Sequence, residues 1–270
     1  MRPAFHIDPP LAAIPAALKG DGLDAFQTTL RDPQRFGKTG IPDAGDQGAY
    51  RAAAAGLWGV AHGSLLINLA SPEGRIRNAS KSSLLGDLAL ALELGFAGVC
   101  FHVGYAKGHD SVEAALTAAA RKLSQVIDGM PARGCAIIEN SCEGSEIVKE
   151  IHHLGQLLRD IGAPREQLGV LIDTCHLHAA GFDLSSADAG DRLAGALDAQ
   201  GILDRVVAFH LNDCQVECGG GLDRHAVPGE GTIGAGLLSI VRHAAFAGLP
   251  MILELSIEGA RRGIKYLSSS

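Results

Sequence analysis

The chain has 270 residues, 47% of them hydrophobic, and a formal net charge of −7. Its length and apolar content predict a single domain over residues 1–270 with a large core. No apolar stretch reaches the roughly 20 residues that a membrane-spanning helix needs, and prolines and charges interrupt the N-terminus where a signal peptide needs an apolar run. The sequence therefore predicts a cytoplasmic protein without a membrane segment.

Eight short runs rich in Val, Ile and Phe recur along the chain, mostly bounded by Gly or Pro, as expected of strands buried on both faces. They cover residues 3–8, 24–30, 58–63, 97–103, 135–140, 169–174, 206–211 and 250–255. Segments with helical spacing, such as 111–129 and 144–162, separate these runs. Eight β/α units predict an α/β fold, a single TIM (β/α)8 barrel, whose active site lies at the C-terminal ends of the strands.

Histidine and carboxylate residues end or directly follow six of these runs, where a folded core gives no reason for them. They are His62, His102, Glu139, Asp173, His210 and Glu254. The motif I-D-T-C-H places His176 three residues after Asp173. The motif L-D-R-H separates Asp223 and His225 by one residue, and an extended segment points both side chains the same way. Together the nine residues predict a polynuclear metal site on one rim of the barrel and hydrolysis of a phosphate ester.

The ligand types suit zinc, or zinc mixed with manganese, which bind imidazole and carboxylate at ~2.0–2.2 Å. The six cysteines form no close C-x-x-C pair, so we expect reduced, mostly buried thiols and no structural thiolate site. We interpret His152, His153 and His243 as ordinary helix residues. His6 and His109 follow strands and are candidates to support the ligands from outside.

Positive side chains cluster in the segments that follow four of the predicted strands. They are Arg31, Arg35, Lys38, Arg75, Arg77, Lys81, Lys107 and Arg224. The net charge disfavours nucleic acid for the domain as a whole, because phosphate binding usually leaves a basic footprint. In a barrel, however, these cations share the rim with the candidate ligands, and bound ions add further positive charge. The alternative interpretation of each is a solvated loop residue.

These motifs resemble those of endonuclease IV, the zinc-dependent family of apurinic/apyrimidinic endonucleases, along nearly the whole chain. The matching stretches are HGSLLINLASP (62–72), FHVG (101–104), IEN (138–140), GVLIDTCHLHAAGFDL (169–184), HLND (210–213), DRHAVPGEGTIG (223–234) and ILE (252–254). The D-T-C-H…A-A-G and D-R-H…G-E-G-x-I-G motifs are highly specific to the family.

The resemblance implies three metal ions per chain: zinc, with manganese as an alternative in the third site. By that resemblance, one ion is held by His62, His102 and Glu139. Glu139 bridges to a second ion, whose further ligands are Asp173, His210 and Glu254. The ligands of the third ion are His176, Asp223 and His225.

The implied reaction is hydrolysis of the phosphodiester 5′ to an abasic site in double-stranded DNA, leaving a 3′-hydroxyl and a 5′-deoxyribose phosphate. Removal of 3′-blocking groups, a 3′-phosphodiesterase activity, accompanies it in the family. Metal ions lower the pKa of bound water to about 7, so no protein nucleophile is needed, and Glu139 or Glu254 orients the attacking water. We expect a monomer, because a long duplex must reach the rim.

The family inserts side chains from the loops after the second and third strands into the duplex. The candidates here are Gln34 and Leu65, and Leu65 stands where the family commonly has tyrosine. An apolar wedge can serve at such a position. Among the rim cations, Arg35, Arg75 and Arg224 are the candidates for phosphate contacts.

Two other classes of function remain open from the sequence. A metal-dependent sugar isomerase or epimerase of the xylose-isomerase-like barrel superfamily needs one or two ions, and does not need His62, His102 and the D-R-H pair together. A non-catalytic protein that binds damaged DNA on the same scaffold predicts binding of abasic duplex without turnover.

Overall fold

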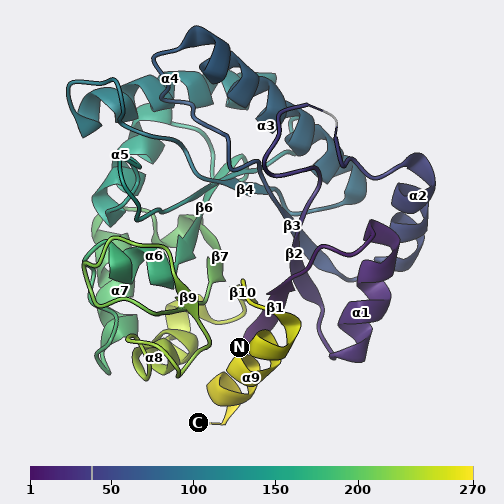
Figure 1. The fold of residues 1–270 in the computed structure, drawn as a ribbon, viewed down its shortest axis with the longest axis vertical. Coiled ribbons are helices and arrows are strands. Elements are labelled where there is room, and N and C mark those ends of the chain that lie inside the picture. The colour runs from purple at the N-terminus through teal and green to yellow at the C-terminus, as the bar shows by residue number, and fades with distance from the viewer. Residues whose placement is uncertain (38, 270) are drawn as a thin grey trace.

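The computed structural model describes residues 1–37 and 39–269 and contains the predicted closed barrel of eight parallel strands (Figure 1). The strands are β1 (Arg2–His6), β2 (Ala25–Thr29), β3 (Trp58–His62), β4 (Val99–Phe101), β5 (Ala136–Glu139), β6 (Leu168–Asp173), β7 (Val206–His210) and β10 (Pro250–Leu253). Each predicted run overlaps one of them. Pairing of β1 with both β10 and β2 closes the sheet.

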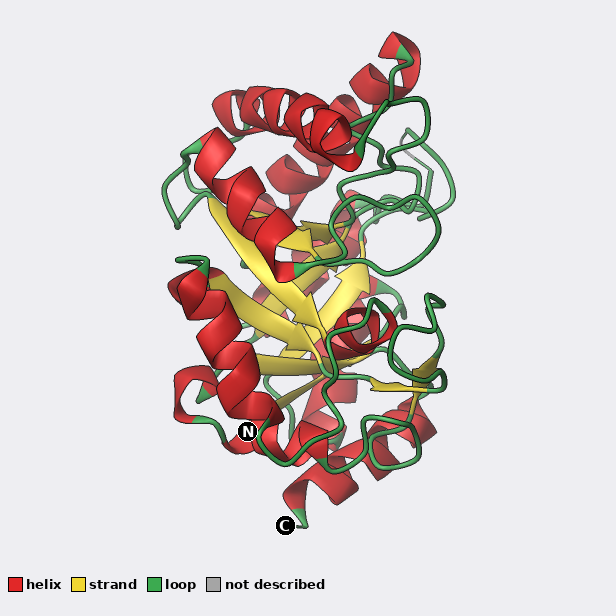
Figure 2. Ribbon diagram, turned by 90° about the vertical axis from the view of Figure 1, so that its left-hand side faces the viewer, coloured by secondary structure: helices red, strands yellow, loops and turns green. Residues whose placement is uncertain are grey.

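Helices enclose the barrel, and long loops gather on one side of it (Figure 2). The helices include α1 (Ile14–Gly20), α2 (Ala44–Ala53), α3 (Gly74–Leu94), α4 (Val112–Gly129), α5 (Ile151–Ile161), α6 (Thr174–Ala179), α7 (Ala189–Ala199), α8 (Gly236–Arg242) and α9 (Ile257–Ser268), with short 3-10 turns η1 (Leu11–Ala13), η2 (Leu203–Arg205) and η3 (Ala244–Phe246). A two-stranded antiparallel ribbon, β8 (Asp213–Cys214) and β9 (His225–Ala226), stands apart from the barrel. Within the described residues, no helix is long and apolar enough to cross a membrane.

The alternation of side chains along the strands divides the core into two parts. Aliphatic residues and cysteines, none of them aromatic, form a separate cluster in the barrel interior: Ala4, Ala25, Val60, Cys100, Cys135, Ile137, Leu171, Ala208 and Ile252. Phenylalanines at neighbouring positions, such as Phe26, belong instead to the cluster that packs against the helices. All six cysteines lie in the described part and are free thiols, and all but Cys218 are buried, as expected.

Two details of the helix prediction are wrong. The segment 144–162 becomes helical only at Ile151, because the backbone before it pairs with another part of the chain: Glu146 forms an antiparallel bridge with Tyr105, and the Ile147 N–H donates to the Gly104 carbonyl. His243 lies just beyond α8 with an extended backbone, where its ring accepts a hydrogen bond from the Ala245 N–H and starts the next turn.

Glycines allow α7 and the start of α8 to pack closely. A Cβ atom on Gly190 would lie 2.6 Å from the Ser239 carbonyl oxygen, and one on Gly236 would lie 1.7 Å from the Leu184 carbonyl oxygen. Both neighbours are backbone atoms, one in α8 and one in the loop before α7, so neither gives way unless these segments separate. Gly195, also on α7, faces open space.

We expect Gly190→Ala to lower the free energy of unfolding by ~1–3 kcal/mol, the typical cost of overpacking. Gly195→Ala on the same helix is the matched control, and we expect it to raise the free energy by up to ~1 kcal/mol through its helix propensity. Urea denaturation of both variants and the parent measures the difference. Equal stabilities of the two variants would contradict the close packing.

Candidate metal centre

Six of the predicted ligands converge on one rim of the barrel because each lies at the C-terminal end of a parallel strand. His62, Glu139, Asp173 and His210 are the last residues of β3, β5, β6 and β7. His102 and Glu254 directly follow β4 and β10. A cavity of about 480 Å³ lies over this rim.

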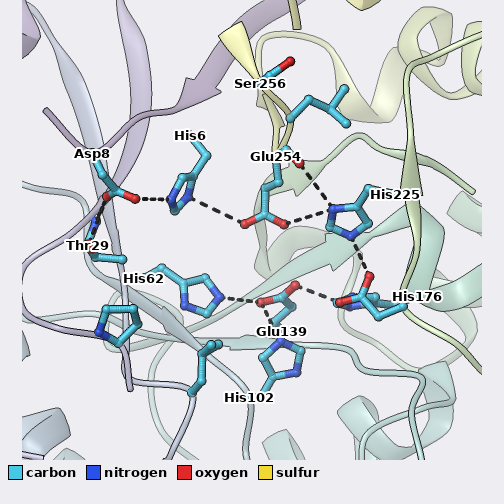
Figure 3. Close-up of a pocket in the computed structure, with 14 residues that line it drawn as sticks. His6, Asp8, Thr29, His62, His102, Glu139, His176, His225, Glu254 and Ser256 are labelled. Atoms are coloured by element: carbon cyan, nitrogen blue, oxygen red, sulfur yellow. Dashed lines mark hydrogen bonds and ion pairs between the residues drawn. The ribbon is translucent and has the colours of Figure 1, made fainter. Parts of the chain in front are cut away.

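The Glu139 carboxylate is the centre of the cluster and is 1% exposed (Figure 3). Its Oε2 lies 3.2 Å from His62 Nε2 and 3.4 Å from His102 Nε2. Its Oε1 lies 2.8 Å from His210 Nδ1 and 3.5 Å from His176 Nδ1. Burial alone raises the pKa of this carboxyl group, but the charges of His210 and His102 hold it well below its usual range.

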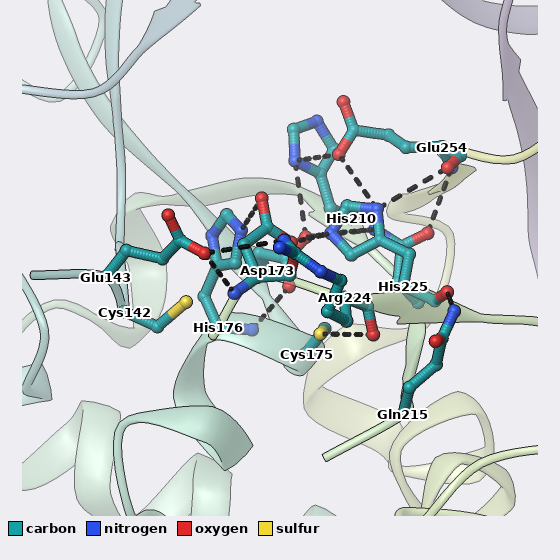
Figure 4. A network of polar contacts seen from close by, with 12 residues as sticks. Cys142, Glu143, Asp173, Cys175, His176, His210, Gln215, Arg224, His225 and Glu254 are labelled. Atoms are coloured by element: carbon teal, nitrogen blue, oxygen red, sulfur yellow. Dashed lines mark hydrogen bonds and ion pairs between the residues drawn. The ribbon is translucent and has the colours of Figure 1, made fainter. Parts of the chain in front are cut away.

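A second cluster lies beside the first, where the β8–β9 ribbon meets α6 (Figure 4). Asp223 places Oδ2 3.2 Å from His176 Nε2 and Oδ1 3.0 Å from His225 Nε2. Asp173 Oδ2 lies 3.5 Å from His225 Nε2, so this carboxylate joins the two clusters. The Asp173 side chain also caps α6 by accepting from the His176 N–H at 2.7 Å, which explains the D-T-C-H spacing.

The hydrogen bonds of the histidines leave nitrogen atoms available for metal. His62 Nδ1 donates to the Gly63 carbonyl, and His176 Nδ1 donates to the Asn140 carbonyl, each at 2.9 Å. Their Nε2 atoms therefore face the carboxylates, and His176 Nε2 is buried and makes no hydrogen bond with any described residue. Ligand atoms of His62, His102 and Glu139 all lie within 4.8 Å of one another. This donor set fits borderline divalent ions such as zinc.

Comparison with known proteins identifies the family. A sequence model described as xylose isomerase-like TIM barrel matches residues 15–270. The probable endonuclease 4 of Methanoculleus marisnigri is 34% identical over 246 residues, which cover 89% of this chain and 86% of the relative. That of Halobacterium salinarum is 35% identical over 247 residues, with 89% and 86% covered. The chain belongs to the endonuclease IV family.

Solved structures agree with this assignment. The crystal structure of endonuclease IV from Thermus thermophilus has a TM-score of 0.81 and 28% identity, and the match covers 100% of both chains. A D-tagatose 3-epimerase-like protein has a TM-score of 0.73 at 18% identity, covering 97% of this chain and 95% of its own, and shows the shared fold alone. The barrel is therefore common to endonuclease IV and sugar enzymes.

The structure adds supporting residues that the sequence analysis missed. Asn140 donates to the Asp173 carbonyl and accepts from the Asp173 N–H, at 3.0 and 2.8 Å. Asn212 donates to Asp173 Oδ2 at 2.9 Å and accepts from the Glu254 N–H at 3.0 Å. Each asparagine directly follows or nearly follows a ligand, in I-E-N and H-L-N-D, which was the available signal. Gln27, a polar residue inside the β2 run, is fully buried beside Glu254 and His210.

The two further histidine candidates, His6 and His109, lie in different surroundings. His6 lies at the centre, with Nδ1 3.7 Å from Glu254 Oε1. His109 instead contacts the Ala70 carbonyl through Nε2 at 2.6 Å and supports the loop between β3 and α3. His6 therefore lies next to a candidate ligand, as predicted. The prediction that His109 supports the ligands is wrong.

The predicted DNA-contacting residues all lie on loops or at a helix start, and all are exposed. Gln34 and Arg35 follow β2, and Leu65, 53% exposed, lines the cavity over the centre. Arg75 is in the first turn of α3, and Arg224 lies between Asp223 and His225, 3.6 Å from Glu143.

Arg31, one of the cations expected on the rim, is not available to bind phosphate. Arg31 is buried and forms an ion pair with Asp87 of α3, 56 residues later, so it ties the loop after β2 to that helix. The prediction that Arg31 is an available cation is therefore wrong. Lys38 lies outside the described residues.

Without bound ions, the carboxylates favour protonated histidines. Burial alone lowers the pKa of His62, but hydrogen bonding to Glu139 and its charge raise it to about 9. Burial likewise opposes the charge on His225, but Asp173 and Asp223 raise its pKa to about 9. The same nitrogen lone pairs thus accept protons when no metal is present.

We expect the ion-free protein to lose stability between pH 6.5 and 9. A folded-state pKa above the unfolded value means that the folded state binds the proton more tightly, so the stabilisation is complete below about pH 6.5 and disappears as pH rises through about 9. Urea denaturation after chelator treatment, at several pH values, measures this. His62→Gln should show a smaller fall over the same range, and an identical fall would remove His62 as its source.

Proposed function

We propose that this protein is a metal-dependent endonuclease that hydrolyses the phosphodiester 5′ to an abasic site in double-stranded DNA. The products are a 3′-hydroxyl and a 5′-deoxyribose phosphate, and the same centre removes 3′-blocking groups. The observation that carries the proposal is the convergence of nine ligand-type residues on one rim in a chain of the endonuclease IV family. The protein acts as a monomer, which leaves the rim open to a duplex.

The proposed centre holds three ions. His62, His102 and Glu139 bind the first, and Glu139 Oε1 extends toward His210, as a bridging carboxylate must. Asp173, His210 and Glu254 complete the second. His176, Asp223 and His225 bind the third. Zinc suits all three sites, with manganese as the alternative in the third, because every donor is an imidazole nitrogen or a carboxylate oxygen.

The ions, when bound, supply a nucleophile at neutral pH and neutralise charge on the phosphate and the departing 3′ oxygen. The remaining task of the protein side chains is to keep the ligands and the attacking water in fixed positions. Glu139 is enclosed by imidazoles and serves as a fixed bridge. Glu139 and Glu254 both line the cavity, but the Glu254 side chain is 19% exposed and Glu139 only 1%, so Glu254 is the carboxylate that orients the attacking water.

The loops after β2 and β3 form one unit that meets the DNA. The Leu65 N–H and the Ser64 hydroxyl both donate to the Pro33 carbonyl, at 2.9 and 2.8 Å. This link fixes Leu65 at the cavity wall beside the loop that carries Gln34. In the proposed complex Leu65 and Gln34 enter the duplex, where a missing base lowers the cost of extruding the nucleotide. Arg35, Arg75 and Arg224 contact phosphates on the rim.

The deciding experiment is incubation with a labelled duplex that contains one tetrahydrofuran abasic analogue, with and without prior chelation. This analogue cannot undergo β-elimination, so a product with a 3′-hydroxyl arises only by hydrolysis. We expect cutting on the 5′ side of the analogue that chelation stops and added zinc restores. An ion-loaded protein that leaves this duplex intact would show that the centre has another substrate.

We expect Glu139→Ala to abolish cleavage and to lower the metal content, because it removes the carboxylate shared by two ions. Glu166→Ala, an exposed glutamate before β6 at the opposite end of the strands, is the control and should retain both. Elemental analysis and the duplex assay measure the two properties. Near-normal cleavage by Glu139→Ala would overturn the assignment of the centre.

We expect Leu65→Ala to weaken binding of the abasic duplex by about tenfold, since burial of a leucine side chain contributes ~1.5 kcal/mol. The turnover number should stay near that of the parent, because Leu65 touches none of the ligands. KM and kcat on abasic duplex, with binding of an undamaged duplex as the matched comparison, separate these effects. An unchanged KM would place Leu65 outside the DNA interface.

A further inference from the structure

Two strands of the barrel contribute no ligand to the proposed centre. Six of the ligands lie at the ends of β3 to β7 and β10, whereas β1, which pairs with β10, and β2, which pairs with β1, add none. In this sector β2 places Gln27, which is 0% exposed, against the centre. Gln27 Nε2 lies 2.7 Å from Glu254 Oε1, and Gln27 Oε1 lies 2.7 Å from His210 Nε2. One side chain thus touches two ligands of the same proposed ion.

The chemistry of the partners fixes the orientation of the amide. An ionised carboxylate only accepts hydrogen bonds, so the group that faces Glu254 has to be the NH2 of Gln27. The carbonyl oxygen then faces His210 and accepts a hydrogen bond from Nε2–H. The reversed amide would place an oxygen against the Glu254 carboxylate and an NH2 against an imidazole N–H. Only the observed arrangement satisfies both contacts.

This contact decides which nitrogen of His210 is available to an ion. Because Nε2 carries the proton that Gln27 accepts, the lone pair of the neutral ring lies on Nδ1. Nδ1 is the atom that faces the carboxylates, 2.8 Å from Glu139, 3.2 Å from Glu254 and 3.7 Å from Asp173. Gln27 therefore directs the imidazole lone pair to the place where the three carboxylates meet.

The second N–H of Gln27 continues the chain of hydrogen bonds away from the centre. It donates to His6 Nδ1 at 2.8 Å, which leaves the His6 proton on Nε2, 3.0 Å from Asp8 Oδ2. Asp8 in turn accepts from the N–H and the hydroxyl of Thr29, both at 2.9 Å. Every polar atom of Gln27 is therefore paired. The contacts that run outward from His6 to Asp8 and Thr29 are drawn in Figure 3.

We propose that Gln27 is a positioning residue that fixes the His210 tautomer and the Glu254 rotamer and so sets the affinity of the site for its ion. The proposal rests on the metal centre described under the proposed function. Partners that hold metal ligands in this way typically change affinity by 10- to 100-fold when they are removed. His6 holds Gln27 by the shorter contact, 2.8 Å, and lies farther from Glu254, at 3.7 Å, so its own effect should be smaller.

The test is Gln27→Met, which keeps the volume of the side chain and removes all of its hydrogen bonds. Gln156→Met, on the outer helix α5, is the matched control. Both proteins, loaded with zinc, are titrated with a competing chelator, and the ions retained are counted. We expect Gln27→Met to release one ion at 10- to 100-fold lower chelator concentration than the parent, with the remaining ions unchanged. Cobalt-substituted protein should show altered absorption for that ion alone.

A second pair of variants separates positioning from a general loss of structure. His6→Ala should weaken the same ion by a smaller factor, and the loss in the double variant should be less than the sum of the two single losses, because the His6–Gln27 contact is removed in both single variants. Additive losses, or release of all ions together with a lowered melting temperature, would overturn the proposal. So would parent-like affinity in Gln27→Met.

The outcomes for Gln27 and for the proposed function are distinguishable. If the parent binds ions and only Gln27→Met loses one, the positioning role stands whether or not the parent cuts abasic DNA. If the parent binds ions and fails to cut that DNA, the proposed function alone is wrong. A parent that binds no ion would overturn both.

Discussion

The rest of the site depends on the burial of Glu139 and Asp173, which are 1% and 0% exposed at neighbouring strand ends. Two carboxylates removed from water are strongly unfavourable unless positive or hydrogen-bonding groups surround them. The barrel satisfies this constraint with imidazoles from other strand ends, and with the Asn212 amide and the His176 N–H, which donate to the Asp173 carboxylate. When no ion is bound, protons on these imidazoles offset the negative charge of the carboxylates. Divalent ions offset that charge more fully.

The sequence predicted the parts of the structure that depend on local pattern. Eight buried runs were sufficient to infer the barrel, because strands covered on both faces are apolar throughout. Six of the nine candidate ligands were predicted from the same pattern, since a histidine or carboxylate at the end of such a run has no role in the core. His62 and Glu139 are adjacent in space although 77 residues separate them, and only the closed topology could predict that.

The parts that the sequence did not reveal depend on single long-range partners. Arg31 is buried because it forms an ion pair with Asp87 on α3. Nothing near Arg31 in the sequence indicates this partner. Gln27 contacts Glu254, 227 residues away. The start of α5 was misplaced because the backbone of Glu146 and Ile147 pairs with Tyr105 and Gly104, about 40 residues earlier, instead of forming helical hydrogen bonds. Helical periodicity contains no information about such a partner.

The G-E-G-T-I-G motif shows how a loop can be as tightly specified as a strand. The Asp213 carboxylate, 0% exposed, accepts hydrogen bonds from the N–H groups of Gly229, Gly231, Ile233 and Gly234. A Cβ atom on Gly231 would lie 2.4 Å from the Cys214 carbonyl oxygen, so glycine is required there by close approach. Because Asp213 and Cys214 form β8, this packing also holds the ribbon partner His225. Endonuclease IV and the sugar epimerases share the barrel, and in this chain the ribbon, fixed by the motif, supplies Asp223 and His225 to the centre. The motif therefore holds in place two of the proposed ligands that do not come from strand ends.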